Sequence, residues 1–285
     1  WSQIGQDIDG EAAGDRSGNS VSLSSDGNTV AIGAYSNDGN GSNAGHVRIY
    51  ENTGGSWSQI GQDIDGEAAG DRSGSRVSLS SDGNTVAIGA PDNAGNGSYA
   101  GHVRIYENTG GSWSQIGQDI DGESAGDNCS FVSLSSDGST VAIGASGNDG
   151  NGNNSGHVRV YENIGGSWSQ ICQDIDGESA GDNCSFVSLS SDGSTVAIGA
   201  SGNDGNGLEA GHVRVFDLIK SQCAGCTDPL AINYDSAGIY NDGSCIYSNC
   251  DLTNTFVVNN NTPGNCNGFI IANSSSSNTP ITYLW

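Results

Sequence analysis

The residues best suited to chemistry in this sequence are carboxylates that recur in one glycine-containing loop. In its first copy, DIDGEAAGD, acidic side chains occupy positions 1, 3, 5 and 9. Calcium takes about six to eight oxygen ligands, and alternating carboxylates in a turning loop supply such oxygens. The spacing therefore predicts a calcium site in each copy of the loop. The candidate ligands are Asp7, Asp9, Glu11, Asp15, Asp63, Asp65, Glu67, Asp71, Asp119, Asp121, Glu123, Asp127, Asp174, Asp176, Glu178 and Asp182.

The same loop also fits a purely structural role. It lacks the full EF-hand pattern and the final bidentate glutamate of that motif, which weakens the calcium hypothesis. In the alternative, Asp7 belongs to the end of a strand and the rest of the loop is a solvated turn. Asp15 then caps backbone amides, as aspartate commonly does in turns.

Four histidines occupy equivalent positions in successive copies of the sequence GHVR: His46, His102, His157 and His212. A ring of metal-binding imidazoles is one hypothesis. A residue that recurs once per structural unit is more typical of a packed, hydrogen-bonded position. His46 and Arg48 share a strand face, so we expect them to bridge neighbouring units. No Ser-His-acid or Cys-His arrangement stands out, and the sequence therefore indicates that the protein is not an enzyme.

These residues belong to a repeat of 55 to 56 residues. The segment WSQIGQDIDGEAAGD begins at Trp1 and recurs, with small changes, at Trp57, Trp113 and Trp168. Self-similarity at a fixed period is typical of proteins built from stacked structural units. The predicted copies are about 1–56, 57–112, 113–167 and 168–218.

Within a copy, apolar residues alternate with polar or small ones, which indicates strands. The predicted strands are 20–24, 29–34, 46–50 and a less regular, bulged segment at 57–64. The turn sequences SSDGN, NDGNG and ENTGGS separate them. Four short antiparallel strands per repeat predict an all-β fold, a β-propeller of four-stranded blades. Four repeats make an incomplete propeller unless the chain closes as a small ring or associates.

The segment SGNSVSLSSDGNTVAIGAYSNDGNGSNAGHVRIYE resembles an FG-GAP-type repeat, the blade unit of integrin-α-like propellers. VAIGAP at 86–91 matches the GAP element, and GHVRIY matches the strand that follows it. The resemblance covers about residues 1–218. Where the family has FG, this sequence has Ser17-Gly18. The turn that carries an Asp-rich calcium loop in many members is reduced to SSDGN, so the family's calcium site is not carried over to it.

Alternate connections between successive strands emerge on opposite faces of a blade. The acidic loop and the NDGNG loop therefore share one face, which gathers most of the carboxylates. Propellers commonly bind ligands through one loop face, because loops tolerate variation that strands do not. The copies differ most directly after NDGNG, where Tyr99 stands in the second copy. We predict a ligand rim that includes Asp38 and Tyr99, with the Tyr99 ring able to stack on a sugar.

The net charge of −25 is concentrated in residues 1–218, which hold 29 acidic and 7 basic residues. Such a surface repels nucleic-acid phosphates and anionic lipids and attracts divalent cations or basic partners. No apolar run approaches the roughly 20 residues that span a bilayer. The predicted partners are glycan, extracellular protein or other copies of the chain, with no nucleic acid and no membrane span.

Eight cysteines, five of them after residue 218, favour disulfides in an oxidising extracellular setting. Cys129, Cys172 and Cys184 lie in the repeats, and we expect them to link neighbouring blades or the loop between them. Because three is an odd number, one of them pairs with the C-terminal cysteines or stays free.

After residue 218 we predict a Cys-rich module at 219–249 and a truncated Ig-like β module at 250–285. GCTDPLAINYDSAGIYNDGSC resembles a module of secreted Bacteroidetes proteins, which implies a Cys226–Cys245 disulfide. CNGFIIANSSSSNTPITYLW resembles the start of an Ig-like adhesin repeat. The first four cysteines after residue 218 also have a spacing that mimics a zinc site, although secretion favours disulfides. The disulfide candidates are Cys226, Cys245, Cys250 and Cys266, and further calcium candidates are Asp228, Asp235 and Asp242.

These features together predict a secreted or cell-surface adhesion protein of a Bacteroidetes-like bacterium. Its propeller would bind glycan or protein, with calcium as the candidate cofactor. The alternative is a structural component of an extracellular filament or matrix, in which near-identical repeats and exposed strand edges drive assembly. An enzyme such as a polysaccharide lyase or hydrolase is disfavoured.

Overall fold

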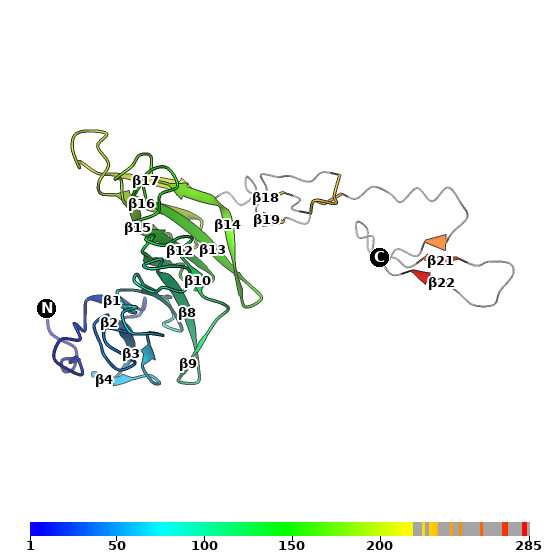
Figure 1. Cartoon of the computed structure of the whole chain (residues 1–285). Coiled ribbons are helices and arrows are strands. Elements are labelled where there is room, and N and C mark those ends of the chain that lie inside the picture. Colours follow the sequence, from blue (N-terminus) through cyan, green and yellow to red (C-terminus); the bar gives the residue numbers. More distant parts are fainter. Residues whose placement is uncertain are drawn as a thin grey trace. The chain divides into compact units, whose positions relative to one another are not determined.

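The computed structural model describes residues 1–218 and, beyond them, seven short segments. It divides the chain into two compact units, Trp1–Ile219 and Lys220–Trp285. Strands, turns and loops make up the described part of both units, which confirms the all-β fold (Figure 1). The described segments beyond residue 218 are 224–225, 228–232, 240–241, 245–246, 257–258, 270–272 and 281–283.

The first sheet shows how one repeat folds. Strands β1 (Ser20–Leu23), β2 (Thr29–Ala34), β3 (His46–Thr53) and β4 (Ser56–Gln59) are antiparallel neighbours in that order. The short strand β5 (Ile64–Asp65) also pairs with β3, further along it. The fourth strand therefore comes from the start of the next sequence copy. We call each such sheet a blade, and blade 1 consists of β1–β5.

The same plan recurs in three further blades. In blade 3 one bulged strand replaces the fourth and fifth strands of blades 1 and 2, and blade 4 has three strands. Blade 2 consists of β6 (Arg76–Leu79), β7 (Thr85–Ala90), β8 (His102–Thr109), β9 (Ser112–Gln115) and β10 (Ile120–Asp121). Blade 3 consists of β11 (Cys129–Leu134), β12 (Thr140–Ala145), β13 (His157–Ile164) and β14 (Ser167–Asp176). Blade 4 consists of β15 (Cys184–Leu189), β16 (Thr195–Ala200) and β17 (His212–Asp217).

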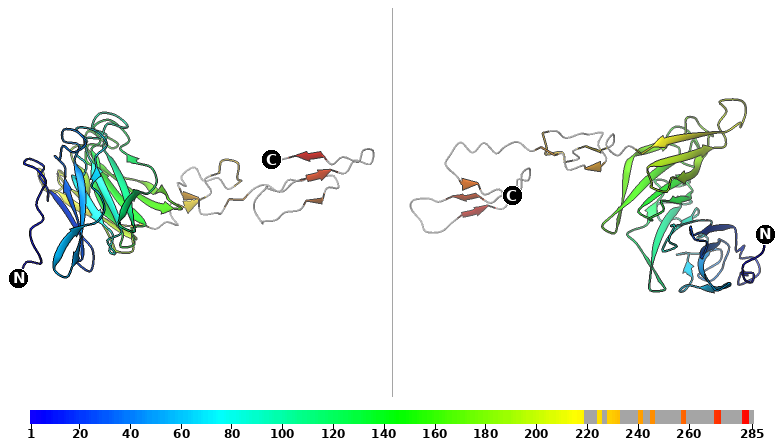
Figure 2. Two further views of the ribbon diagram at one scale, coloured as in Figure 1. Left: turned by 90° about the horizontal axis from the view of Figure 1, so that it is seen from below. Right: turned by 180° about the vertical axis from the view of Figure 1, so that it is seen from behind.

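The blades lie side by side in chain order, with their first strands adjacent (Figures 1 and 2). Serine side chains of one first strand accept hydrogen bonds from the backbone of the next. The Val77 amide donates to Ser20 Oγ at 3.0 Å, and the Leu134 amide donates to Ser78 Oγ at 3.0 Å. The alternation of serine with Val or Leu therefore gives each first strand two different faces. The Val and Leu side chains pack in the core, and the serine side chains link neighbouring blades.

The hydrophobic core lies between blades rather than inside one. Val103 and Ile105 of blade 2 belong to the same buried cluster as Ile143 of blade 3. At the outer edge, Trp113 Nε1 of blade 2 donates to the carbonyl oxygen of Ile60 in blade 1 at 3.0 Å. The interface between blades 2 and 3 repeats this scheme, with Trp168 Nε1 donating to the carbonyl oxygen of Ile116 at 2.9 Å, as expected for a propeller in which blades pack face to face.

Within the described residues, blades 1 and 4 each have one face that no other blade covers. Val21 of β1 is 62% exposed, whereas its counterpart Val77 in blade 2 is 8% exposed. Val213 of β17 is 68% exposed, whereas its counterpart Val103 is fully buried. The repeats thus form an open row whose two ends carry unpaired halves of the interface found between blades.

The second unit contains short strands. Strand β18 (Ala224–Gly225) pairs in parallel with β19 (Tyr240–Asn241). Strands β20 (Val257–Val258), β21 (Ile270–Ala272) and β22 (Ile281–Tyr283) form an antiparallel sheet. Of the sites predicted in this unit, Cys245 is disulfide-bonded, and Asp228 Oδ1 accepts a hydrogen bond from the Leu230 amide at 2.9 Å. The other predicted residues lie outside the described part: Cys226, Asp235, Asp242, Cys250 and Cys266.

Candidate functional site

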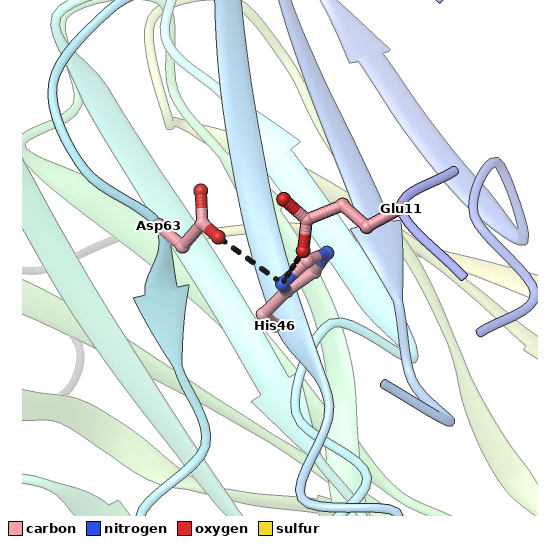
Figure 3. Close-up of side chains that lie close together, drawn as sticks. All are labelled: Glu11, His46 and Asp63. Atoms are coloured by element: carbon pink, nitrogen blue, oxygen red, sulfur yellow. Dashed lines mark ion pairs between the residues drawn. The ribbon is translucent and has the colours of Figure 1, made fainter. Parts of the chain in front are cut away.

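The carboxylates of the acidic loop meet the recurring histidines at three places. In the first, His46 Nδ1 lies 3.8 Å from Glu11 Oε2 and 3.6 Å from Asp63 Oδ2 (Figure 3). Glu11 is in the loop that leads into β1, His46 is the first residue of β3, and Asp63 precedes β5. The two acids are thus position 5 of one copy of the loop and position 1 of the next copy.

The same arrangement is present in blades 2 and 3, and only partly in blade 4. His212 Nδ1 lies 3.7 Å from Glu178 Oε2, but no third ligand group joins this pair in the described chain. The two complete copies are Glu67–His102–Asp119, with distances of 3.8 and 3.9 Å to His102 Nδ1, and Glu123–His157–Asp174, with distances of 3.7 and 3.5 Å to His157 Nδ1.

Burial and charge set the protonation of these groups. The pKa of His102 is lowered to about 4, first because its burial disfavours the charged form and then because Arg104 is close. Burial raises the pKa of Glu67. The neighbouring His157 is the main reason why the pKa of Asp174 is lowered. The His102 imidazole is therefore neutral at pH 7.

A buried arginine accompanies the histidine in blades 1–3, and in blade 2 it ties neighbouring blades together. Arg104 Nη2 donates to the backbone carbonyl of Asp65, in blade 1, at 2.6 Å. Its Nη1 lies 3.7 Å from Glu67 Oε1, and its guanidinium carbon lies 5.5 Å from the centre of the Tyr106 ring. The prediction that this strand face bridges neighbouring blades is confirmed for the arginine. The partners of His102 are instead Glu67, from the loop between blades, and Asp119, from its own blade.

The last carboxylate of the loop has a structural task. Asp71 Oδ2 accepts hydrogen bonds from the Ala68 amide at 2.9 Å and from Asn93 Nδ2 at 3.1 Å. Asp15 makes the equivalent bonds, to the Ala12 amide and to Asn37 Nδ2. This confirms the predicted capping role of Asp15. It also shows that the acidic loop and the NDGNG loop lie on the same face.

The four carboxylates of one loop therefore have different neighbours. Asp65, at the third position, ends β5, whereas Asp71 caps its own turn. Among the described residues, the groups of three or more side chains that could share an ion are the three Glu–His–Asp groups. A set with an imidazole nitrogen differs from the all-oxygen set that calcium prefers. Sequence reasoning missed these groups because it compared residues within a loop. The sequence signal for these groups is the pairing of position 5 in one copy of the loop, Glu11, with position 1 in the next copy, Asp63, 52 residues later.

The loop face also carries a shallow open depression of about 630 Å³. Its lining includes Asn43, Glu67, Arg72, Asp92 and Tyr99. The Tyr99 side chain is 56% exposed, and its backbone adopts a left-handed φ of 58°.

Of the two residues predicted for the ligand rim, Tyr99 lies at this depression. Asp38 is not part of its lining. Asp38 Oδ1 instead accepts a hydrogen bond from the Asn43 amide at 2.7 Å. Asp38 thus shapes the loop that bears Asn43.

The prediction that Cys129 and Cys184 link blades is wrong, because both are free, buried thiols. Each lies in the core between two blades, where its backbone amide donates to the preceding blade, to Ala100 and Ser155 respectively, at 2.9 Å. Serine holds the equivalent place at Ser73. Burial raises the pKa of the Cys129 thiol to about 11. Cys172, the third cysteine of the repeats, is disulfide-bonded.

Comparison with known proteins supports the sequence resemblance at the first repeat. Residues 8–50 match the FG-GAP repeat family, and no curated protein matches the sequence. Among solved structures, hydrazine synthase of Kuenenia stuttgartiensis is 18% identical, with a TM-score of 0.48, and covers 71% of this chain and 53% of its own. A putative 6-phosphogluconolactonase of Bacteroides uniformis is 11% identical, with a TM-score of 0.48, covering 70% and 49%.

A third similar structure is Sqt1 of Saccharomyces cerevisiae, which is 13% identical, with a TM-score of 0.46, and covers 72% of this chain and 46% of its own. This chain therefore spans about half the length of these proteins. The FG-GAP match falls on the acidic loop and the first three strands of blade 1. The near-identical copies that follow extend the resemblance to blades 2–4, and the repeat region is FG-GAP-like.

Proposed function

We propose that the protein is an extracellular binding protein that uses the loop face of its blades to hold a glycan or a partner protein. The observation that carries the proposal is the depression at Tyr99, where an exposed aromatic ring stands among charged and amide side chains. The proposal assigns no catalytic reaction and no nucleic-acid partner to the chain.

The chemistry of the depression suits a sugar. The Tyr99 ring offers an apolar face against which the C–H groups of a sugar ring can pack. Arg72 and Asp92 form an ion pair at 3.1 Å beside it, and the Asn43 amide adds both a donor and an acceptor. Ligand sites of this kind combine a hydrophobic contact area with a few polar groups that fix orientation.

Only blade 2 has an aromatic residue at this place. The equivalents of Tyr99 in the other copies are Asn43, Asn154 and Glu209, and these three also have left-handed φ values of 51° to 52°. The backbone is thus the same in each copy, while the side chain varies. An exposed side chain that varies on a constant backbone is typical of a recognition surface.

Several features support an extracellular location and a role for calcium. FG-GAP repeats are typical of extracellular proteins, and residues 8–50 match this family. Over the described residues, the structure contains no helix of the length and hydropathy that crossing a bilayer requires. We include calcium in the proposal because the loop face is rich in carboxylates, which attract divalent cations.

A glycan array probed with the full chain tests the proposal. We expect binding that Tyr99→Ala abolishes and that the matched variant Asn154→Ala leaves intact. A chelator such as EGTA should weaken binding if calcium takes part. Absence of any glycan binding, or equal binding by both variants, would refute the glycan version of the proposal. If binding is retained in EGTA, calcium takes no part in it, and that part of the proposal is refuted.

A second candidate function is assembly into a filament or matrix, and the exposed end faces favour it. Val21 and Val213 are exposed although their counterparts are buried in the same interface between blades. Blade 1 of one copy can therefore cover blade 4 of another, in the way that adjacent blades pack. Sedimentation and electron microscopy of the full chain, compared with Val21→Asp, test this. Monomers at all concentrations would exclude assembly.

A further inference from the structure

We propose that each complete Glu–His–Asp group binds one divalent transition-metal ion, with Zn²⁺ as the probe. Three groups are complete: Glu11–His46–Asp63, Glu67–His102–Asp119 and Glu123–His157–Asp174. Glu67 belongs both to one of these groups and to the lining of the Tyr99 depression, but the inference is tested by zinc binding and not by glycan binding.

The spacing of the atoms suits a shared ion. In blade 1, His46 Nδ1 lies 3.8 Å and 3.6 Å from the two carboxylate oxygens, which is long for a hydrogen bond. Zinc holds nitrogen and oxygen ligands at about 2.0–2.2 Å in a tetrahedron, which places neighbouring ligand atoms about 3.4 Å apart. The three ligand atoms of each group lie within 4.8 Å of one another. A movement of the exposed carboxylate oxygens by up to about 1.4 Å would therefore complete the site.

A buried, unpartnered nitrogen points into the group. The His46 and His157 side chains are 1% exposed, and the Nδ1 atom of each makes no hydrogen bond in the described chain. Figure 3 shows His46 Nδ1 directed between Glu11 and Asp63. A buried polar atom without a partner destabilises the folded state. A bound ion would satisfy this nitrogen in blades 1 and 3.

The ligand types select the class of ion. An imidazole nitrogen with two carboxylates suits zinc and other first-row transition metals, whereas calcium prefers oxygen ligands alone. Metal binding requires the neutral imidazole, so it should weaken as the pH falls.

The surroundings also suit an ion that enters from solvent. Arg48 Nη1 lies 3.8 Å from Glu11 Oε1, the oxygen that does not face His46, and thus orients the carboxylate from behind. Glu11 is 43% exposed and Asp63 is 29% exposed. An ion can therefore reach the buried imidazole, and water can take the remaining coordination position.

Blade 4 supplies a control within the same molecule. His212 lies 3.7 Å from Glu178, like its counterparts, but among the residues that the structure describes this pair is not part of a complete group. A matched pair of variants, His102→Gln and His212→Gln, therefore removes the same side chain from a complete and from an incomplete group.

The experiment is a zinc titration of the full chain, with a chromophoric chelator as competitor and with Ca²⁺ in a parallel titration. We expect His102→Gln to lower the number of bound zinc ions by one and His212→Gln to leave it unchanged. Calcium should bind at least tenfold more weakly at these sites. Because the variants are compared with each other, zinc held by cysteines in the rest of the chain does not affect the result.

Asp119→Asn serves as a second variant, because it changes a partly exposed ligand and leaves the buried imidazole in place. It too should remove one zinc ion. An unchanged stoichiometry in both His102→Gln and Asp119→Asn would overturn the proposal, as would an equal loss in His212→Gln. If His102→Gln fails to fold, as judged by circular dichroism, Asp119→Asn alone decides. Loss of glycan binding without loss of zinc would affect only the proposed function.

Discussion

The four blades have nearly the same sequence but different surroundings. Blades 2 and 3 lie in the interior of the row, whereas blades 1 and 4 lie at its ends. HVRIY in β8 and HVRVF in β17 begin with the same three residues. Val103 of β8 is fully buried, whereas Val213 of β17 is 68% exposed. The burial of a strand face is therefore supplied by the neighbouring blade. Repeat arrays owe their stability to such nearest-neighbour interfaces.

Substitution of a glycine should give the largest difference in the free energy of unfolding between an interior blade and an end blade. A Cβ atom added at Gly144 would lie 1.9 Å from the carbonyl oxygen of Ser185 in the next blade. At Gly199 in blade 4 the only atom of the described residues within 4 Å of an added Cβ is Phe186 Cβ, at 3.3 Å. Gly144→Ala should lower the free energy of unfolding by at least about 3 kcal/mol, because backbone must move. Gly199→Ala should change it by less than about 1 kcal/mol.

Urea denaturation of the full chain, followed by tryptophan fluorescence, measures both glycine variants. Equal destabilisation by Gly144→Ala and Gly199→Ala would show that blade 4 is covered in solution. Such a result would favour association between copies over an open row.

A second comparison uses an identical substitution at equivalent positions. Val103→Ala should lower the free energy of unfolding by about 2 kcal/mol, because two buried methyl groups are lost and a cavity remains. Val213→Ala should cost about 0.5 kcal/mol or less, because that side chain is exposed. The same denaturation measurement applies. A cost at Val213 that matches the cost at Val103 would contradict the structural difference between the blades.

The smallest effect concerns the two free thiols of the blades. Cys129 and Cys184 are both buried, and burial raises the pKa of both. Both should react with a thiol reagent many-fold more slowly in the native protein than in urea, because the thiolate is the reactive form. Cys184 should react first, because blade 4 has a neighbour on one side only. Single Cys→Ser variants, labelled and followed by mass spectrometry, distinguish the two. Faster reaction of Cys129 would contradict the ranking.

Much of the blade follows from local pattern. The predicted strand at 29–34 coincides with β2, and the prediction for 46–50 is the first part of β3. Asp15 was recognisable as a cap, and Tyr99 as a surface residue, from their positions in turns. The cysteines were misjudged because a cysteine in a repeat can replace a buried serine as readily as form a disulfide. Cys129 replaces a buried serine, because it occupies the position equivalent to Ser73 and is a free thiol.

By itself, the sequence determined the repeat, its strands and turns, and the shared face of the acidic and NDGNG loops, because these depend on alternation and turn chemistry within about 50 residues. Only the tertiary structure decided that Glu11 and Asp63 meet at His46, that the core lies between blades, and that Val21 and Val213 remain exposed. The physical reason is that these contacts join separate copies. A repeating sequence specifies each copy in the same way, but it does not specify which copies have neighbours.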